Sequence, residues 1–201
     1  ARTIIKPVKP GAPTAIKIEK TQLAALTRSA AAINNQTRYI TVQDFSSFIW
    51  LVFYLLKKPL SGSLVLLFPT IELLEKVDAI LNKQYVGQAA LIHSQLSKGA
   101  YWRAYQKLLL GQAKIILSTR QGVFLPIPDN SKIIMWNAGS DDFKQTDQHP
   151  RYDSRTVAAW LAASTKSNLI FTSPAPILSP HASSYPHHAL PSATPQTTRV
   201  A

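Results

Sequence analysis

Six short apolar segments alternate with helix-like segments along this chain, and this alternation limits the possible folds more than any other feature. The predicted strands are residues 38–42, 64–68, 89–93, 114–118, 132–136 and 168–172. Each is a nearly continuous apolar run, as expected of a strand that is covered on both faces. The predicted helices are residues 19–34, 45–58, 71–84, 97–110 and 151–164. Such alternation requires right-handed crossover connections, so it predicts a three-layer α/β fold with helices on both faces of a mostly parallel sheet.

The two ends of the chain differ in composition from this body. Residues 1–15 carry three basic residues, Arg2, Lys6 and Lys9, and three prolines, which predicts an extended basic arm. Residues 174–201 contain six prolines, several histidines and serines and little charge, so we expect a disordered tail. One folded lobe is therefore predicted over residues 16–173.

The overall charge and the amino acids that are absent narrow the possible functions. Twenty-two Lys and Arg against ten Asp and Glu give a net charge of +12, which favours a polyanionic partner, although a basic protein without one fits the composition too. The chain has no cysteine, which excludes disulfides, thiolate metal sites and cysteine nucleophiles. The longest apolar run, at residues 48–56, is much shorter than the roughly 20 residues of a membrane-spanning helix. We therefore expect a cytoplasmic protein with no membrane partner and no metal site.

The glycines do not form a phosphate-binding loop. Such a loop needs closely spaced glycines that turn backbone N–H groups towards phosphate, followed by a lysine. The seven glycines are at positions 11, 62, 87, 99, 111, 122 and 139. None is followed by lysine, and no pair has the spacing of a mononucleotide or dinucleotide loop, so the sequence predicts that neither loop is present.

Four less common stretches follow one another in a specific order. They are LVLLFPTIELLEKV (64–77), LIHSQLSKGAYWRAYQKLLLGQAKIILSTRQGVFLPIPD (91–129), FKQTDQHPRYDSRTVA (143–158) and LIFTSPAPIL (169–178). Together they resemble the first motor lobe of the primosomal replication-restart DNA helicases (primosomal protein N'), a family within superfamily two. The resemblance covers about residues 20–178, and it implies a RecA-like lobe of the P-loop NTPase type.

The same resemblance locates a nucleotide site whose chemistry is missing. The phosphate loop of the family falls on residues 40–47, where Ser46 replaces the lysine and Ser47 stands at the magnesium-binding hydroxyl. The acidic box of the family falls on Trp136, Asn137, Ala138 and Gly139. Members of the family bind ATP and Mg²⁺ with these groups. The resemblance therefore implies a degenerate lobe with no catalytic residue and no bound cofactor.

The groups that would contact nucleic acid are retained. His93, Ser94, Thr119 and Arg120 match family positions near strand ends, where hydroxyls and a guanidinium can bind phosphate. Arg120 is the strongest candidate, because a guanidinium suits bidentate phosphate contact. Local roles fit two of these residues equally well: Thr119 as a helix cap and Arg120 as a surface ion-pair partner. His93 stands at the end of an apolar strand, where a hydrogen-bonded, semi-buried structural histidine is more common than a ligand.

Arg151 and Arg155 allow both a functional and a structural interpretation. Arg151 and Arg155 lie one turn apart in a predicted helix that Pro150 begins, so they could face phosphate together or pair with Asp147 or Asp153.

The segment 97–110 mixes aromatic and basic residues. They are Tyr101, Trp102 and Tyr105 beside Lys98, Arg103 and Lys107. These aromatic side chains could stack on single-stranded bases. The helical spacing favours the alternative that Trp102 and Tyr105 face the core and the basic residues face solvent.

Three functional hypotheses follow. In the first, a degenerate helicase-like lobe binds forked or single-stranded DNA, together with replication proteins, in replication restart and without ATP hydrolysis. In the second, the chain is part of an active ATP-dependent DNA helicase, although the groups that act on ATP are missing and the chain has room for only one lobe. In the third, the proline-rich tail makes the protein an interaction scaffold.

Overall fold

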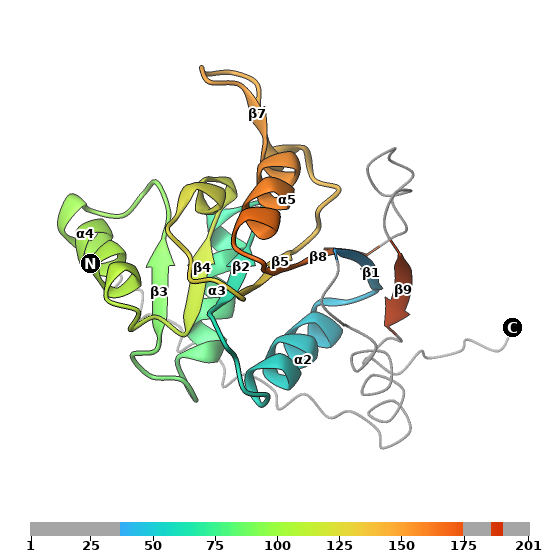
Figure 1. The fold of residues 1–201 in the computed structure, drawn as a ribbon, viewed down its shortest axis with the longest axis horizontal. Helices are drawn as coiled ribbons and strands as arrows, with labels where there is room; N and C mark the ends of the chain where they lie inside the picture. Colours follow the sequence, from blue (N-terminus) through green and yellow to red (C-terminus); the bar gives the residue numbers. More distant parts are fainter. Residues whose placement is uncertain (1–36, 175–185, 191–201) are drawn as a thin grey trace, which may run out of the picture.

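The computed structural model describes residues 37–174 and 186–190, which form an α/β fold around one large parallel sheet (Figure 1). The sheet strands are β1 (Arg38–Val42), β2 (Leu64–Leu67), β3 (Ala89–Ile92), β4 (Ile115–Ser118), β5 (Lys132–Met135), β8 (Asn168–Ser173) and β9 (His187–Leu190). The α-helices are α2 (Phe45–Leu56), α3 (Ile71–Leu81), α4 (Lys98–Leu109) and α5 (Ser154–Ser164), and there are two 3₁₀ helices, η1 (Arg120–Phe124) and η2 (Asp141–Phe143). The predicted arm (1–15) and the predicted helix 19–34 lie outside the described residues.

The strands are ordered β3-β4-β2-β5-β8-β1-β9, and each pairs in parallel with its neighbours. All six strands predicted from the sequence are present, and so are the four predicted helices within the described part. The apolar run at residues 48–56 lies within α2, whose buried residues pack on the sheet. No helix in the described part combines the length and the apolar character needed to cross a bilayer.

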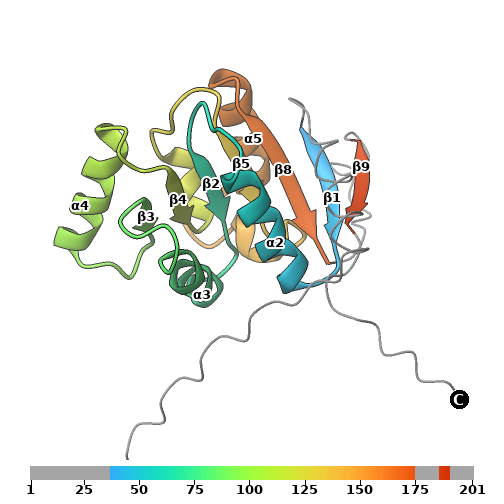
Figure 2. The same cartoon turned by 90° about the horizontal axis from the view of Figure 1, so that it is seen from below.

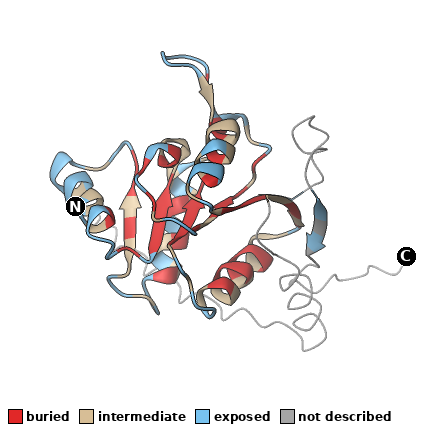
Figure 3. Ribbon diagram, in the orientation of Figure 1, coloured by how far each residue is buried: buried red, intermediate tan, exposed pale blue. Residues whose placement is uncertain are grey.

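The helices lie on the two faces of the sheet and bury both of them (Figures 2 and 3). Along β2, Leu66 packs in the cluster that includes α2 and α3, whereas Val65 and Leu67 pack in the opposite cluster with α4, η1 and α5. This period-two alternation explains why the strands are apolar throughout, because successive side chains enter different cores. The predicted three-layer α/β architecture is therefore confirmed.

Each crossover helix begins close to the carboxyl end of the strand before it. A side-chain oxygen at each start accepts a backbone N–H of the first turn: Asp44 at α2, Thr70 at α3 and Ser97 at α4. Such caps satisfy donors that have no partner inside the helix. The helix starts and the polar connections therefore gather along one edge of the sheet, which we call the carboxyl edge.

A short hairpin rises from this edge and changes one sequence-based prediction. Strands β6 (Lys144–Gln145) and β7 (Tyr152–Asp153) pair antiparallel, and α5 begins only at Ser154. Pro150 follows a cis peptide bond inside the hairpin. The prediction that Pro150 begins a helix at residue 151 is therefore wrong, because the residues after it pair as a strand first.

The second difference concerns the predicted disordered tail. Residues 187–190 form β9, which pairs in parallel with β1. The ring of His187 stacks on that of Tyr39, with 5.4 Å between their centroids. The prediction of disorder is therefore wrong for these four residues, and the remaining limits of the arm, lobe and tail stay predictions.

We predict that Gly122→Ala destabilises the fold. A Cβ atom at Gly122 would lie 2.5 Å from Leu67 Cδ2 and 2.6 Å from Ser118 Cβ, because η1 packs directly on β2 and β4. Overpacking of this kind lowers the free energy of unfolding by about 1–3 kcal/mol. Urea unfolding of the full chain measures the change.

The matched control is Gly99→Ala in α4. A Cβ there would meet only Arg103 Nη1, at an ordinary contact distance of 3.5 Å. Since alanine also favours a helix interior over glycine by about 0.5–1 kcal/mol, this variant should be at least as stable as the wild type. Equal stability of the two variants would contradict the packing described for η1.

Candidate nucleic-acid interface

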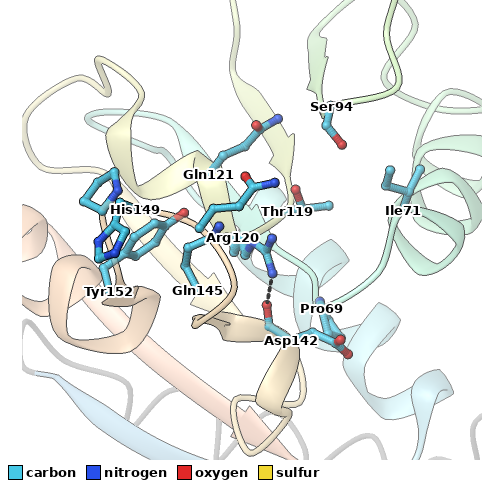
Figure 4. Close-up of a pocket in the computed structure, with 12 residues that line it drawn as sticks. Pro69, Ile71, Ser94, Thr119, Arg120, Gln121, Asp142, Gln145, His149 and Tyr152 are labelled. Carbon is cyan, nitrogen blue, oxygen red and sulfur yellow. Dashed lines mark hydrogen bonds between the residues drawn. The ribbon is translucent and has the colours of Figure 1, made fainter.

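A cleft of about 450 Å³ opens at the carboxyl edge, between the ends of β2, β3 and β4 and the hairpin (Figure 4). Its lining residues are Pro69, Ile71, Ser94, Thr119, Arg120, Gln121, Asp142, Gln145, Gln148, His149, Pro150 and Tyr152. Ligands of open parallel sheets bind at this edge. Three residues that the sequence singled out, Ser94 after β3 and Thr119 and Arg120 after β4, meet in the cleft.

Arg120 lies in the middle of this cleft, with Ser94 and Ile71 on one side and His149 and Tyr152 on the other (Figure 4). Its Nη1 atom donates to the Asp142 carbonyl oxygen at 3.5 Å, which is a long hydrogen bond. None of the salt bridges among the described residues involves Arg120. The ion-pair alternative that the sequence allowed is therefore not observed, and most of the guanidinium donors face the cleft without a carboxylate partner.

Thr119 stands at the start of η1, but its side chain makes no capping hydrogen bond there. The capping role that the sequence allowed is therefore not observed either. The half-buried Thr119 hydroxyl lies beside Arg120 in the cleft lining, where Ser94 contributes a second, exposed hydroxyl. Two hydroxyls and a guanidinium form a donor set of the kind that binds phosphate oxygens.

The hairpin holds Arg120 in place from the other side. Ser154 Oγ donates to the Arg120 carbonyl oxygen at 3.4 Å. Tyr152 packs edge-on against Phe124 of η1, with 5.0 Å between the ring centroids. Burial raises the pKa of the Tyr152 phenol, while the positive charge of Arg120 opposes the rise. The start of α5 and the hairpin therefore hold the backbone of η1, which carries Arg120; the sequence did not predict this role for the hairpin.

His93 does not reach the cleft. It follows β3, only 4% of its surface is exposed, and it is not among the residues that line the cleft. Its Nδ1 atom is buried without a hydrogen-bond partner among the described residues. His93 is therefore buried, as the structural alternative expects, but its unpaired Nδ1 does not fit the hydrogen-bonded histidine of that alternative.

Arg155 is held inside the fold. Its Nε and Nη2 atoms donate to the two Asp153 carboxylate oxygens at 2.8 and 2.6 Å, and Nη1 donates to the Ala138 carbonyl oxygen at 3.0 Å. Only 16% of its side chain is exposed. Arg151 is exposed but precedes α5. The two arginines therefore do not lie on one helix face, which was one of the two alternatives that the sequence allowed. We therefore leave Arg155 out of the interface and keep Arg151 as a prediction.

The start of α2, where the resemblance locates the phosphate loop, holds a carboxylate of the chain itself. Only Gln43 and Asp44 separate β1 from α2. The Ser47 backbone N–H and hydroxyl donate to the two carboxylate oxygens of Asp44 at 2.8 and 3.1 Å. A helix N-terminus binds phosphate through such free donors. Here Asp44 accepts one of these donors, the Ser47 N–H, and the fully buried Ser47 hydroxyl donates to the same carboxylate, so both groups of Ser47 are already paired within the chain.

Aromatic rings fill the end of β5, where the resemblance locates the acidic box. Trp136 is 6% exposed, and its ring centroid lies 4.4 Å from that of Phe48 and 6.0 Å from that of Phe45. Phe68 meets Phe48 edge-on, with 5.9 Å between the centroids. We call Phe45, Phe48, Phe68 and Trp136 the aromatic cluster. It is part of the hydrophobic core, where a carboxylate that holds a metal ion would have to be desolvated.

The rest of the former box also has a structural role. Asn137 has a left-handed backbone with φ 51°, and the buried Ala138 donates its N–H to the Thr172 carbonyl oxygen at 2.8 Å. The nearby Asp141 pairs with Lys144, whose hydrogen bond lowers the pKa of that carboxyl group. Among the described residues no group of three or more His, Asp or Glu side chains could hold a metal ion.

We predict that Trp136→Ala strongly destabilises the fold, because Trp136 is a core residue. Removing a buried tryptophan lowers the free energy of unfolding by about 3–5 kcal/mol. Trp160→Ala on α5 is the matched control, since 70% of Trp160 is exposed and its loss should change stability by no more than about 0.5 kcal/mol. Thermal or urea unfolding of both variants checks this. A cost below about 1 kcal/mol for Trp136→Ala would mean that the aromatic cluster is not a packed core.

Sequence comparisons find similarity to proteins named replication restart protein PriA. The chain is 33% identical to that of Synechocystis sp. over 116 residues, 29% identical to that of Helicobacter pylori strain J99 over 117 residues and 26% identical to that of Chlamydia trachomatis over 121 residues. These matches cover 58%, 58% and 60% of this chain but only 14%, 19% and 16% of those proteins. No protein-family profile matches the chain. These matches confirm the resemblance to the primosomal helicase family. The matched segment spans less than a fifth of the length of each of these relatives.

Structural comparisons confirm the fold. The helicase domain of Pyrococcus furiosus Hef superposes with a TM-score of 0.58 at 15% identity, over 86% of this chain and 40% of that chain. The Escherichia coli DEAD-box protein SrmB gives a TM-score of 0.53 at 14% identity, over 83% and 97% of the two chains. The C-terminal domain of the DEAD-box protein Dbp5 gives 0.51 at 14% identity, over 68% and 75%. The chain therefore has the RecA-like fold of a helicase lobe.

Proposed function

We propose that this chain is a helicase-like lobe that binds the phosphate backbone of DNA through the Arg120 cleft and does not hydrolyse ATP. The observation that carries the proposal is the contrast between the two halves of the carboxyl edge. One half presents Arg120 without a carboxylate partner in an open cleft, and the other half is filled by the aromatic cluster. The relatives are named for replication restart, which is the process we propose for this chain.

The chemistry of the cleft favours phosphate over bases as the ligand. Guanidinium, hydroxyl and amide groups line it, and they recognise phosphate oxygens without reading the sequence. The one carboxylate in the lining, Asp142, already accepts a hydrogen bond from the Ser140 hydroxyl at 2.9 Å. The net charge of +12 adds a long-range attraction for any polyanion. We therefore expect salt-sensitive binding that is largely independent of sequence, with forked or single-stranded DNA and replication proteins as the partners.

The absence of ATP hydrolysis is supported by two separate features of the chain. Asp44 places a negative charge where a nucleotide phosphate would bind, so a bound nucleotide would meet electrostatic repulsion. Trp136 occupies the position of the carboxylates that would hold magnesium, and it is packed against Phe48. Restoring a nucleotide site would require changes at both places, and a single substitution would not suffice.

The salt dependence of DNA binding tests this proposal. For wild type, the logarithm of the affinity for duplex DNA should fall with the logarithm of salt concentration with a slope of about −0.9 for each phosphate contacted. Arg120→Ala should weaken binding and make the slope shallower by about one phosphate contact. Fluorescence anisotropy across a salt series measures both quantities.

Lys114→Ala is the matched control for this experiment. Lys114 is exposed at the amino end of β4, and Arg120 follows the carboxyl end of the same strand. Both substitutions remove one positive charge, but only Arg120→Ala should change the slope. Equal changes of the slope in the two variants would show that binding depends on the net charge alone and not on a site at Arg120. Binding that does not depend on salt would contradict the proposal.

A further inference from the structure

Helix α4 exposes aromatic side chains on its outer face. Trp102 is 55% exposed and Tyr101 is 38% exposed, while Ala104 and Leu108 pack towards the sheet. The prediction that Trp102 faces the core is therefore wrong. Tyr105 is half-buried between the two environments. Leu108, Ala104 and part of Tyr105 make the core contact of this helix, and Tyr101 and Trp102 are left on its surface.

These rings have a common orientation. The Tyr101 and Tyr105 planes differ by 11° with 6.2 Å between the centroids, and the Trp102 and Tyr105 planes differ by 20° with 6.1 Å between the centroids. We call Tyr101, Trp102 and Tyr105 the α4 platform. Nearly parallel rings that are already ordered in the free protein lose little conformational freedom when a flat group stacks on them. Exposed aromatic groups of this kind usually mark a binding surface.

The charges on α4 indicate what kind of partner stacks there. Residues 98–109 include Lys98, Arg103 and Lys107 and no acidic residue. The Arg103 guanidinium folds back over the first turn, with Nη1 3.5 Å from the position of a Cβ atom on Gly99. Aromatic faces beside unopposed positive charges are the combination that binds single-stranded nucleic acid, through bases on the rings and phosphates on the charges.

The α4 platform is also connected to the cleft. Ser94 lines the cleft, and Ser97 caps α4 only three residues later, so the first turn of α4 begins at the same edge of the sheet. A strand whose backbone lies along Ser94 and Arg120 would reach Lys98 and Arg103 next. Its bases would then meet Tyr101 and Trp102. Hydrogen-bond donors and positive charges thus follow one another from the cleft to α4. They favour one path for the nucleic acid, which begins in the cleft and continues over α4.

We propose that the α4 platform stacks on the bases of single-stranded DNA whose backbone is held in the Arg120 cleft. The inference rests on the proposed function for the backbone contact and adds the surface that holds the bases. Bases in a duplex are already stacked on one another, so the platform favours a single strand or the unpaired arm of a fork. Stacking on a ring does not depend on the identity of the base.

The test compares three DNA ligands of equal length: an oligothymidine strand, an abasic strand and a duplex. Trp102→Ala in the full chain should weaken binding to oligothymidine by about 5- to 100-fold, the range for loss of one stacked base. Binding to the abasic strand and to the duplex should change less than twofold, because neither offers an unpaired base. Trp102→Phe, which keeps an aromatic face, should recover part of the loss.

Trp160→Ala is the matched control, because Trp160 is an exposed tryptophan on a different helix. It should leave binding to all three ligands unchanged. Two outcomes would contradict the stacking inference while the wild type binds DNA. Trp102→Ala could leave binding unchanged, as Trp160→Ala does, or it could weaken binding to all three ligands equally. In either case the cleft proposal stands. If wild type binds none of the ligands, both fail, and a protein partner on the α4 platform becomes the alternative.

Discussion

The fold depends on the parallel sheet, because parallel strands buried on both faces leave only one place for polar chemistry. Side chains along β2 and β5 alternate between two hydrophobic cores, so neither strand can carry a functional group along its length. Polar residues therefore follow the strand ends, and parallel pairing brings those ends to one edge. The cleft, the start of α2 and the aromatic cluster are neighbours for this reason.

The two halves of that edge illustrate that a fold does not determine a function. In one half, Trp136 and Phe48 extend the core up to the end of β5, and Asp44 satisfies the start of α2. In the other half, Arg120 is positioned by backbone and ring contacts and keeps its charge available. The proposed function thus combines, on one RecA-like scaffold, a nucleotide site that is filled by side chains with an open cleft. We propose that a lobe of this kind binds nucleic acid without a motor step.

The sequence predicted the long elements because their apolar periodicity is strong, and the resemblance to the helicase family drew attention to Trp136. It missed the hairpin, since strands of two residues carry no periodic signal. The pairing of Arg155 with Asp153 depends on where α5 begins, which the sequence placed too early. Trp102 was assigned to the core from the helical spacing of the aromatic residues, whereas α4 packs inwards through Ala104, Tyr105 and Leu108.

Nucleotide binding by the full chain tests the central claim most directly. The melting temperature should be measured with and without millimolar magnesium-ATP, in the absence and in the presence of single-stranded DNA. The account predicts no change on addition of magnesium-ATP in either case, because Asp44 and the aromatic cluster occupy the site. A ligand at about 100 times its dissociation constant would add about 2.7 kcal/mol of stability, so binding would be readily detected. A rise in melting temperature that depends on magnesium-ATP would contradict the account.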